Sequence, residues 1–421
     1  MLFRLGLLLV LLPLVAGFHG YGGYGRYGEE SLEEWFRKYM ERYYGRLGHR
    51  KCEFKYWNQT HCEKLEQLLE KARTDTDPFA VYDADNTIWQ YDLEESLLPY
   101  LENKKILVRD KIDPSLKLLP FKGDESLFAY YYRLCEIDDK VCYPWIAQVF
   151  SGFTLKTLAT YVHELFALNS TIPVKYWEGG KLVSSAVHTP VIYKAQRELI
   201  TKLQQNGVKV YIMTAALEEL VRVVATDPKY GLNIPTERVI GVSLLLKDPT
   251  TNKLTTARKQ IADRHFFDSE YTEEQHYDSI LTPYLWTPGT WFVGKRAAIM
   301  DYIEPVQKPI LVAGDSPNDH WMLLYSGSHK IWVDRKRKYT LATRRLIEAR
   351  QEEEEEHEGT SDAGENWIFA KPEQLHGNVG KGPGKGGKGV KITVTGGRGK
   401  SPPIEKGLKY YLTHSWKNTR H

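Results

Sequence analysis

The chain has 421 residues, enough for two or three domains, and its 42% hydrophobic and 26% charged residues are ordinary for a soluble globular protein. These proportions exclude a chain that is too polar to bury a core. The formal net charge of +3 is small, so it gives no reason to expect a nucleic-acid partner.

The first 17 residues have the pattern of a secretory signal peptide. Arg4 precedes an apolar run that ends near Val15, and small residues follow up to Gly17. An uncleaved membrane anchor is the alternative, but the run is short for a span and Pro13 interrupts it. We therefore predict cleavage after Gly17, a secreted extracellular protein, and no membrane span after cleavage.

Residues 18–50 combine a Gly/Tyr-rich leader with a predicted helix. The alternation at 21–28 has no apolar face to bury, so it favours a flexible linker over an adhesive segment. Ser31 and Glu34 then form a capping-box pattern ahead of apolar residues at helical spacing. We expect a helix to begin here.

Secretion makes the cysteines informative, because an oxidising compartment favours disulfides. Four cysteines allow three pairings, which the sequence alone does not distinguish. We favour local pairs over a zinc site, because no further ligands stand at zinc-site spacing. The favoured pairs are Cys52 with Cys62 and Cys135 with Cys142. Two N-glycosylation sequons, which agree with secretion but also occur by chance, begin at Asn58 and Asn169.

Residues 51–345 form the predicted main domain, in which short apolar strands alternate with amphipathic helices. The segments 79–82, 208–213 and 310–313 have the length and apolarity of buried strands, and a helix is expected at 195–205. This order predicts an α/β fold with a doubly wound parallel sheet. Ligands bind such sheets at the carboxyl ends of the strands.

Residues 346–421 differ from the main domain in composition. An acidic run spans 352–356, and a Gly- and Lys-rich segment spans 377–399. Blocks of like charge are usually solvated and disordered, so we expect an unstructured tail. The alternative is a basic segment that contacts a polyanion, such as an acidic glycan, a mineral surface or a matrix component.

The first predicted strand is followed by two carboxylates, Asp83 and Asp85. Side chains two residues apart in an extended segment share a face, so both can point into one site. Close carboxylates repel each other unless a cation joins them. The pair therefore indicates metal binding, acid/base chemistry or both. The alternative, a surface turn with capping aspartates, is disfavoured by the apolar strand before the pair and by Thr87 after it.

Polar residues also follow the other predicted strands. Thr214 and two alanines come after the second strand, a hydroxyl before a helix start that suits a phosphate oxygen. Asp315 and Asp319 come after the third strand, and Lys295 opens another helical stretch. In this order and strand placement, the four segments resemble the four motifs of the haloacid dehalogenase phosphatases.

That resemblance implies a Rossmann-type core and a magnesium-dependent phosphatase. Asp83 would be the nucleophile, and Asp85 would be the general acid and then the base that activates water. Thr87 would steady the loop between them, while Thr214 and Lys295 would hold the phosphoryl oxygens. The implied Mg²⁺ ligands are Asp83, the main-chain carbonyl of Asp85, Asp315 and Asp319.

Longer strings resemble the bacterial phosphorylcholine phosphatases over most of residues 78–345, among them DLEESLLPYLE, YYYRLCEIDDKVCYPW, QVFSGFTL and TPYLWTP. This resemblance implies a mainly helical cap, inserted at about 92–190, that closes over the site and sets substrate choice. The fourth motif departs from the family, because the spacing from Asp315 to Asp319 is closer to that of phosphoserine phosphatases.

The cap contains residue types that suit a choline head group. A quaternary ammonium group cannot donate a hydrogen bond, so aromatic faces and diffuse negative charge hold it. In the resembled family, residues that match an acidic pair and a tyrosine cluster are implicated in this grip. The matching residues here are Glu94, Glu95, Tyr130, Tyr131, Tyr132 and Arg133. The alternative is an ordinary helix with an exposed acidic pair and tyrosines in the cap core.

The sequence therefore predicts a secreted phosphomonoesterase that hydrolyses phosphorylcholine, or a related phosphorylated amino alcohol, through an aspartyl-phosphate intermediate. One alternative keeps this mechanism and changes the substrate to phosphoserine or a broad range of monoesters. A second alternative is a secreted matrix or binding protein that retains the fold without turnover. The presence of every catalytic residue type argues against that second alternative.

Overall fold

The computed structural model describes residues 52–358 and 360–377. The predicted signal peptide, the leader with its helix at Ser31, and the basic segment beyond residue 377 lie outside the described residues. From Phe54 onward, the described chain belongs to one compact unit.

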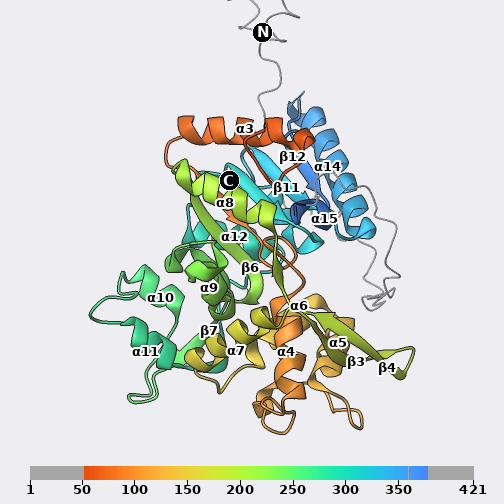
Figure 1. Ribbon diagram of the computed structural model, residues 1–421, viewed down its shortest axis with the longest axis vertical. Helices are drawn as coiled ribbons and strands as arrows, with labels where there is room; N and C mark the ends of the chain where they lie inside the picture. The colour runs from red at the N-terminus through yellow and green to blue at the C-terminus, as the bar shows by residue number, and fades with distance from the viewer. Residues whose placement is uncertain (1–51, 359, 378–421) are drawn as a thin grey trace, which may run out of the picture. The chain divides into compact units, whose positions relative to one another are not determined.

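An eight-stranded sheet organises this unit, with the strand order β12-β11-β10-β1-β6-β7-β8 and with β9 also paired to β7 (Figure 1). All neighbouring strands are parallel except β8 and β9, which run antiparallel to β7. The predicted parallel α/β sheet is confirmed, with an antiparallel extension at one edge. The strands are β1 (Phe79–Tyr82), β6 (Lys209–Leu217), β7 (Val239–Lys247), β8 (Leu254–Thr255), β9 (Ile280–Trp286), β10 (Leu311–Gly314), β11 (His329–Val333) and β12 (Trp367–Ala370).

The central strands β1 and β10 are apolar throughout because both of their faces are covered. Phe79 and Val81 of β1 pack in one cluster with residues of α12 (Val293–Tyr302), α13 (His320–Leu323) and α14 (Arg337–Glu358), whereas Ala80 and Tyr82 point to the opposite layer. The helices outside the cap are α3 (Gln59–Thr74), α8 (Lys194–Gln205), α9 (Glu218–Thr226), α10 (Ala257–Ala262), α11 (Glu273–Asp278), α12 (Val293–Tyr302), α13 (His320–Leu323), α14 (Arg337–Glu358) and α15 (Pro372–Leu375).

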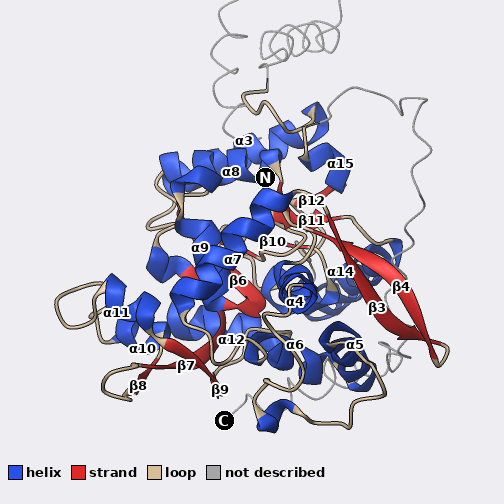
Figure 2. Cartoon of the chain, turned by 60° about the horizontal axis from the view of Figure 1, so that its bottom comes forward, coloured by secondary structure: helices blue, strands red, loops and turns tan. Residues whose placement is uncertain are grey.

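The segment between β1 and α8 forms the cap, which is mainly helical as expected. Short strands β2 (Trp89–Gln90) and β5 (Val191–Ile192) pair with each other at its base. Figure 2 shows its helices beside a long antiparallel hairpin. The cap elements are α4 (Leu93–Asn103), α5 (Leu127–Ile137), α6 (Asp139–Gln148), α7 (Leu155–Leu168), β3 (Thr171–Glu178) and β4 (Lys181–His188).

The predicted disulfide between Cys135 and Cys142 is confirmed, and it joins α5 to α6 with Cα atoms 5.0 Å apart. Cys52 and Cys62 are disulfide-bonded as well, so none of the four cysteines, all in the described part of the chain, is free. Within the described ranges, no helix combines the length and the apolarity that a membrane span requires.

The predicted start of an unstructured tail at residue 346 is too early. The acidic run 352–356 lies on α14, β12 adds a parallel strand beside β11, and α15 follows. Leu346 and Trp367 are buried, which explains why this segment is ordered despite its charge. The acidic run forms a turn of this helix with no buried residue, and Arg350 pairs with Glu353 and Glu354 in it.

Candidate active site

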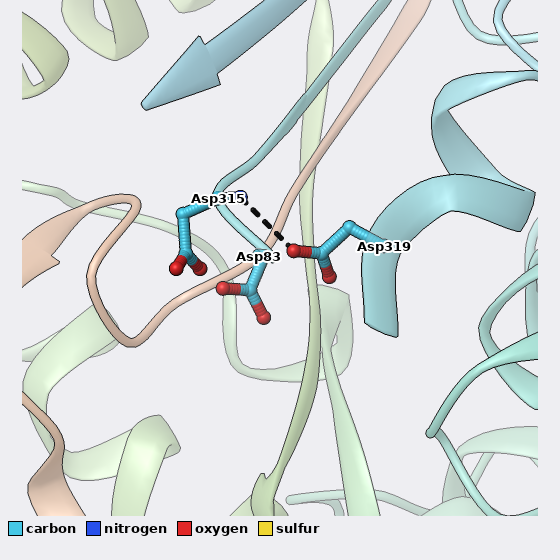
Figure 3. A group of neighbouring side chains, drawn as sticks. All are labelled: Asp83, Asp315 and Asp319. Carbon is cyan, nitrogen blue, oxygen red and sulfur yellow. Dashed lines mark hydrogen bonds between the residues drawn. The ribbon is translucent and has the colours of Figure 1, made fainter. Parts of the chain in front are cut away.

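The carboxyl ends of β1 and β10 bring three buried carboxylates together (Figure 3). Asp83 follows β1, and its N–H donates to the carbonyl of Ala313 in the adjacent β10 at 2.9 Å. Oxygen atoms of Asp83, Asp315 and Asp319 all lie within 4.8 Å of one another. Asp319 is oriented by the backbone N–H groups of Asp315 and Ser316, which donate to its Oδ2 at 3.0 and 3.1 Å.

Lys295 supplies positive charge to this cluster from the first turn of α12. Its Nζ donates to Asp83 Oδ1 at 2.6 Å and to Asp319 Oδ1 at 2.7 Å, and its side chain is fully buried. Burial opposes the charge of Lys295, but Asp319 and Asp83 outweigh burial and raise the pKa of the ammonium group. Lys295 is therefore a fixed cation beside Asp83.

Arg335 is a second cation of the site, and it is not among the residues predicted from the sequence. It follows β11, the neighbour of β10, and its guanidinium pairs with Asp315. The available signal was a cationic residue two positions after the short apolar segment 331–333, which is the end of a parallel strand. Burial still raises the pKa of Asp315, while Arg335 opposes that shift. Burial and the neighbouring Asp319 likewise hold the pKa of Asp83 well above its usual range.

The loop after β1 holds Asp85 and Thr87 in different ways. Thr87 donates from its buried hydroxyl, which lies 3.1 Å from Asp83 Oδ2 and 3.4 Å from Asp315 Oδ1. Asp85 Oδ1 accepts hydrogen bonds from Trp89 Nε1 at 2.6 Å and from the N–H of Leu93 at 2.8 Å. The Asp85 side chain is therefore held separately from the three clustered carboxylates. Burial and Asp92 raise its pKa well above the usual range.

Thr214 lies in β6, next to β1, where the pairing of β6 with β7 is irregular. The register with β7 shifts between Met213 and Leu217, so the backbone here leaves the regular ladder. Thr214 is buried, and its Oγ1 accepts a hydrogen bond from the N–H of Ala216 at 3.1 Å. The strand order thus places Thr214 on the strand beside β1, and its role in phosphate binding stays a prediction.

The structure brings together only some of the six residues considered for the choline head group. Glu95 of α4 accepts hydrogen bonds from the hydroxyls of Tyr131 and Tyr132 of α5, at 3.2 and 3.4 Å. Burial raises the pKa of Glu95, while Lys336 opposes that shift. We call Glu95, Tyr131 and Tyr132 the cap cluster.

Tyr130 and Arg133 have their polar groups engaged elsewhere in the cap. The hydroxyl of Tyr130 accepts from the N–H of Leu119 at 2.7 Å and donates to its carbonyl at 3.1 Å. Arg133 pairs with the buried carboxylate of Glu125 at 2.6 Å. Both side chains therefore bond within the cap, and for Tyr130 this agrees with the alternative that the tyrosines lie in the cap core.

Glu94 also differs from its neighbour Glu95. It is buried, and its Oε1 accepts a hydrogen bond of 2.9 Å from the N–H of Leu217 at the start of α9. No side chain of α9 itself caps this end of the helix. Burial raises the pKa of Glu94 well above its usual range. Glu94 thus ties the cap to the segment that carries Thr214.

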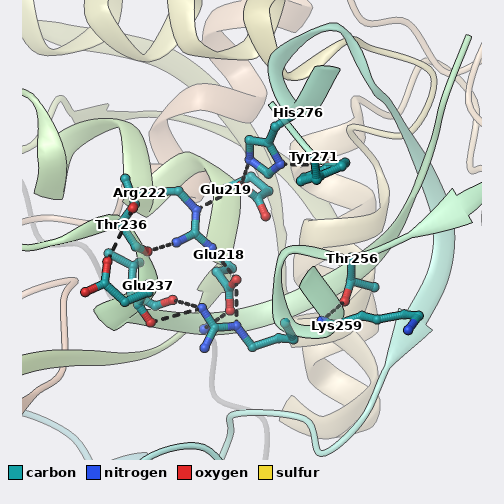
Figure 4. A network of polar contacts seen from close by, with 12 residues as sticks. Glu218, Glu219, Arg222, Thr236, Glu237, Thr256, Lys259, Tyr271 and His276 are labelled. Carbon is teal, nitrogen blue, oxygen red and sulfur yellow. Dashed lines mark hydrogen bonds and ion pairs between the residues drawn. The ribbon is translucent and has the colours of Figure 1, made fainter. Parts of the chain in front are cut away.

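A buried ionic network fixes the other side of α9 (Figure 4). Glu218 accepts from Arg222, from Arg258 at 3.0 Å and from the N–H of Gly241 at 3.0 Å. Glu219 accepts from Arg222 at 3.1 Å and contacts His276 at 2.9 Å. These bonds connect α9 to β7, α10 and α11, so the helix after Thr214 has a rigid support.

The sequence is 49% identical over 331 residues to the phosphorylcholine phosphatase of Pseudomonas aeruginosa, covering 77% of this chain and 93% of that protein. No family model matches the chain. A conserved protein of unknown function from Anaerococcus prevotii has a TM-score of 0.45 and 17% identity, over 71% of this chain and 92% of that chain. A HAD family hydrolase from Salmonella enterica serovar Typhi has a TM-score of 0.38 and 10% identity, over 75% of this chain and 90% of that chain.

Proposed function

The chain belongs to the phosphorylcholine phosphatase family of haloacid dehalogenase-type phosphatases, and from this membership we propose that it hydrolyses phosphorylcholine, or a related phosphorylated amino alcohol, to the free alcohol and phosphate. It is a phosphoric monoester hydrolase. The observation that carries the proposal is the convergence of Asp83, Asp315, Asp319 and Lys295 at one edge of the sheet.

The donor set of this site suits Mg²⁺. Three buried carboxylates have oxygen atoms within 4.8 Å of one another, and Mg²⁺ prefers hard oxygen ligands. The residues that would hold it are Asp83, Asp315, Asp319 and the main-chain carbonyl of Asp85. When bound, Mg²⁺ neutralises charge on the phosphate dianion, which lets a carboxylate approach it.

In the proposed reaction, a carboxylate oxygen of Asp83 forms a bond to phosphorus while the bond from phosphorus to the alcohol oxygen breaks. Lys295 and Thr214 hold the other phosphoryl oxygens, so developing charge meets fixed donors. Asp85 gives its proton to the departing alcohol and then takes one from water, which attacks the aspartyl phosphate and releases phosphate. Thr87 steadies Asp83 through the hydrogen bond of 3.1 Å.

We further propose that the cap cluster recognises the ammonium group. Glu95 provides negative charge, and Tyr131 and Tyr132 provide aromatic faces from a neighbouring helix. Glu94, in contrast, positions α9 through the N–H of Leu217. The acidic pair therefore divides into one recognition residue and one positioning residue.

Two isosteric substitutions test this division. Glu95→Gln is expected to raise KM for phosphorylcholine by about tenfold or more, since it removes a desolvated charge from the ammonium site. The same change spares an aryl phosphate. Glu94→Gln keeps a carbonyl oxygen that accepts from Leu217, so activity on both substrates stays near that of the unmodified enzyme. Steady-state kinetics with both substrates measures this, and equal losses for Glu95→Gln on the two substrates would reject the recognition role.

Secretion is part of the proposal. The apolar leader ending near Gly17, the disulfide-bonded cysteines and the sequons at Asn58 and Asn169 all support it. Asn169 is exposed at the end of α7, where an oligosaccharide has room. A matrix or polyanion contact through the basic segment beyond residue 377 stays a secondary proposal, supported by composition alone.

Phosphate release from three substrates tests the proposed function: phosphorylcholine, phosphoserine and an aryl phosphate, each with Mg²⁺ or with a chelator. We expect a preference for phosphorylcholine and loss of all activity with the chelator. Preference for phosphoserine would favour the second phosphatase reading, for which the spacing from Asp315 to Asp319 is the supporting observation. No phosphate release from any of the three substrates would favour a binding protein without turnover.

A further inference from the structure

An aromatic pair joins the cap to the core beside the site. Tyr143 lies on α6 of the cap, and Phe292 directly precedes α12 of the core. Their rings are stacked, with centroids 6.2 Å apart and planes 21° from parallel. The two residues come from segments about 150 positions apart in the sequence, so this stacking is a tertiary contact between cap and core.

The backbone of Phe292 forms hydrogen bonds with residues beside the proposed phosphate site. Its N–H donates to Asn318 Oδ1 at 2.6 Å, and Asn318 lies between Asp315 and Asp319. Its carbonyl accepts from the N–H of Lys295 at 3.2 Å. The position of the Phe292 ring is therefore fixed relative to the lysine that contacts Asp83.

The backbone of Phe292 is also strained. Its φ of +50° with a ψ of −124° is a conformation in which glycine is favoured and a side chain costs roughly 1–3 kcal/mol. The loop has glycines at 289 and 294, but the position with the positive φ is occupied by Phe292. A phenylalanine in this conformation indicates that its ring has a role at this place.

Tyr143 is linked to the proposed ammonium site through neighbouring residues of α6. The adjacent Cys142 is linked to Cys135 of α5, the helix that carries Tyr131 and Tyr132. Trp145, also on α6, stacks on Tyr131 with centroids 6.3 Å apart and planes 24° from parallel. Burial raises the pKa of Tyr143 well above its usual range, and Asp139 and Glu95 add to this shift. Tyr143 therefore lies on a helix that a disulfide and an aromatic stacking contact join to the helix of Tyr131 and Tyr132.

We propose that the stacked pair of Tyr143 and Phe292 fixes the distance between the ammonium site and the phosphate site, and so determines which length of phosphorylated amino alcohol is hydrolysed. This inference rests on the proposed function. Both residues are positioning residues. Phe292 is hydrogen-bonded to Lys295 and Asn318, and Tyr143 is linked to the helix of the cap cluster. Their stacking contact therefore connects the phosphate site with the ammonium site. A substrate with a longer or shorter spacer cannot place its ammonium group at the cap cluster and its phosphorus atom beside Asp83 at the same time.

Two trimethylammonium substrates that differ by one methylene in the spacer provide the test. The enzyme as it exists is expected to favour phosphorylcholine, with its two-carbon spacer, over the three-carbon homologue by about tenfold or more in kcat/KM. Tyr143→Leu and Phe292→Leu remove the stacking and are expected to bring this ratio to within about twofold of unity. Tyr143→Phe keeps the ring and is expected to keep the ratio.

Controls separate this inference from folding defects and from the proposed function. Tyr284→Leu removes an exposed ring, 61% accessible, on β9 and should leave the ratio unchanged. Aryl phosphate hydrolysis by each variant shows whether the phosphate site is intact.

An unmodified enzyme that favours phosphorylcholine over the aryl ester, but hydrolyses the two ammonium substrates equally well, would overturn this inference and leave the proposed function standing. The same holds if Tyr143→Leu and Phe292→Leu keep the ratio. An unmodified enzyme with no preference for either ammonium substrate over the aryl ester would overturn both.

Discussion

Replacing Asp83 by asparagine is expected to lower kcat by about 10⁴-fold or more, because the variant lacks the carboxylate that forms the bond to phosphorus. The loss should be the same for phosphorylcholine and for an aryl phosphate, since both pass through this atom. Stability should change little. Burial and Asp319 oppose the charge on Asp83 while Lys295 favours it, so a neutral side chain of the same shape loses an ion pair but relieves repulsion, and Asp319 still pairs with Lys295.

Asp110→Asn is the matched control, because its side chain is 90% exposed in the cap and lies outside the site. Single-turnover kinetics and thermal unfolding of both variants separate chemistry from folding. A variant at Asp83 that folds normally and retains more than a few per cent of the activity would contradict a nucleophilic role for this residue.

Replacing Lys295 by methionine is expected to lower kcat/KM by about 10²- to 10³-fold on all substrates, since a preorganised cation no longer meets the phosphoryl oxygens. It should also destabilise the metal-free protein. Lys295 is fully buried between Asp83 and Asp319, and removing one partner of such a group costs roughly 3–5 kcal/mol. Urea unfolding with a chelator measures the free energy of unfolding, and added Mg²⁺ should restore part of it.

Lys330→Met is the matched control for this change. Lys330 is a buried lysine on β11, and no ion pair within 4.0 Å joins it to an acidic residue in the described part of the chain. Its replacement should leave activity unchanged. If Lys295→Met kept full activity with Mg²⁺, the lysine would be needed for charge balance in the metal-free protein and not for phosphate binding.

The fold was predictable from the sequence where pattern and packing agree. The segments 79–82 and 310–313 are buried, uninterrupted apolar runs, and 208–213 is apolar apart from Lys209, so each indicates a strand of the core. β12 and α14 were not predicted, because the acidic run 352–356 dominates the local composition. Their order depends on the burial of Leu346 and Trp367, a tertiary property that composition does not reveal.

The site was predictable to a different degree in its two halves. Asp83 and Asp315 directly follow the adjacent parallel strands β1 and β10, so the sheet topology brings them to one edge, where Lys295 reaches them from the first turn of α12. The cap residues depend on helix rotation and on local partners. Glu94 and Glu95 are adjacent in sequence, yet one bonds Leu217 and the other bonds Tyr131. Arg335 was missed because its strand, β11, was not recognised.

The covalent role of Asp83 is tested most directly by mass spectrometry of Asp85→Asn, mixed with an aryl phosphate and Mg²⁺ and quenched in acid. An aryl oxide leaves without a proton, so the first step proceeds, whereas hydrolysis lacks its base and the intermediate accumulates. We predict a phosphate adduct on the peptide that contains Asp83, absent when Asp83 is also changed to asparagine. Turnover without any adduct on that peptide, or an adduct on another residue, would contradict the proposed mechanism.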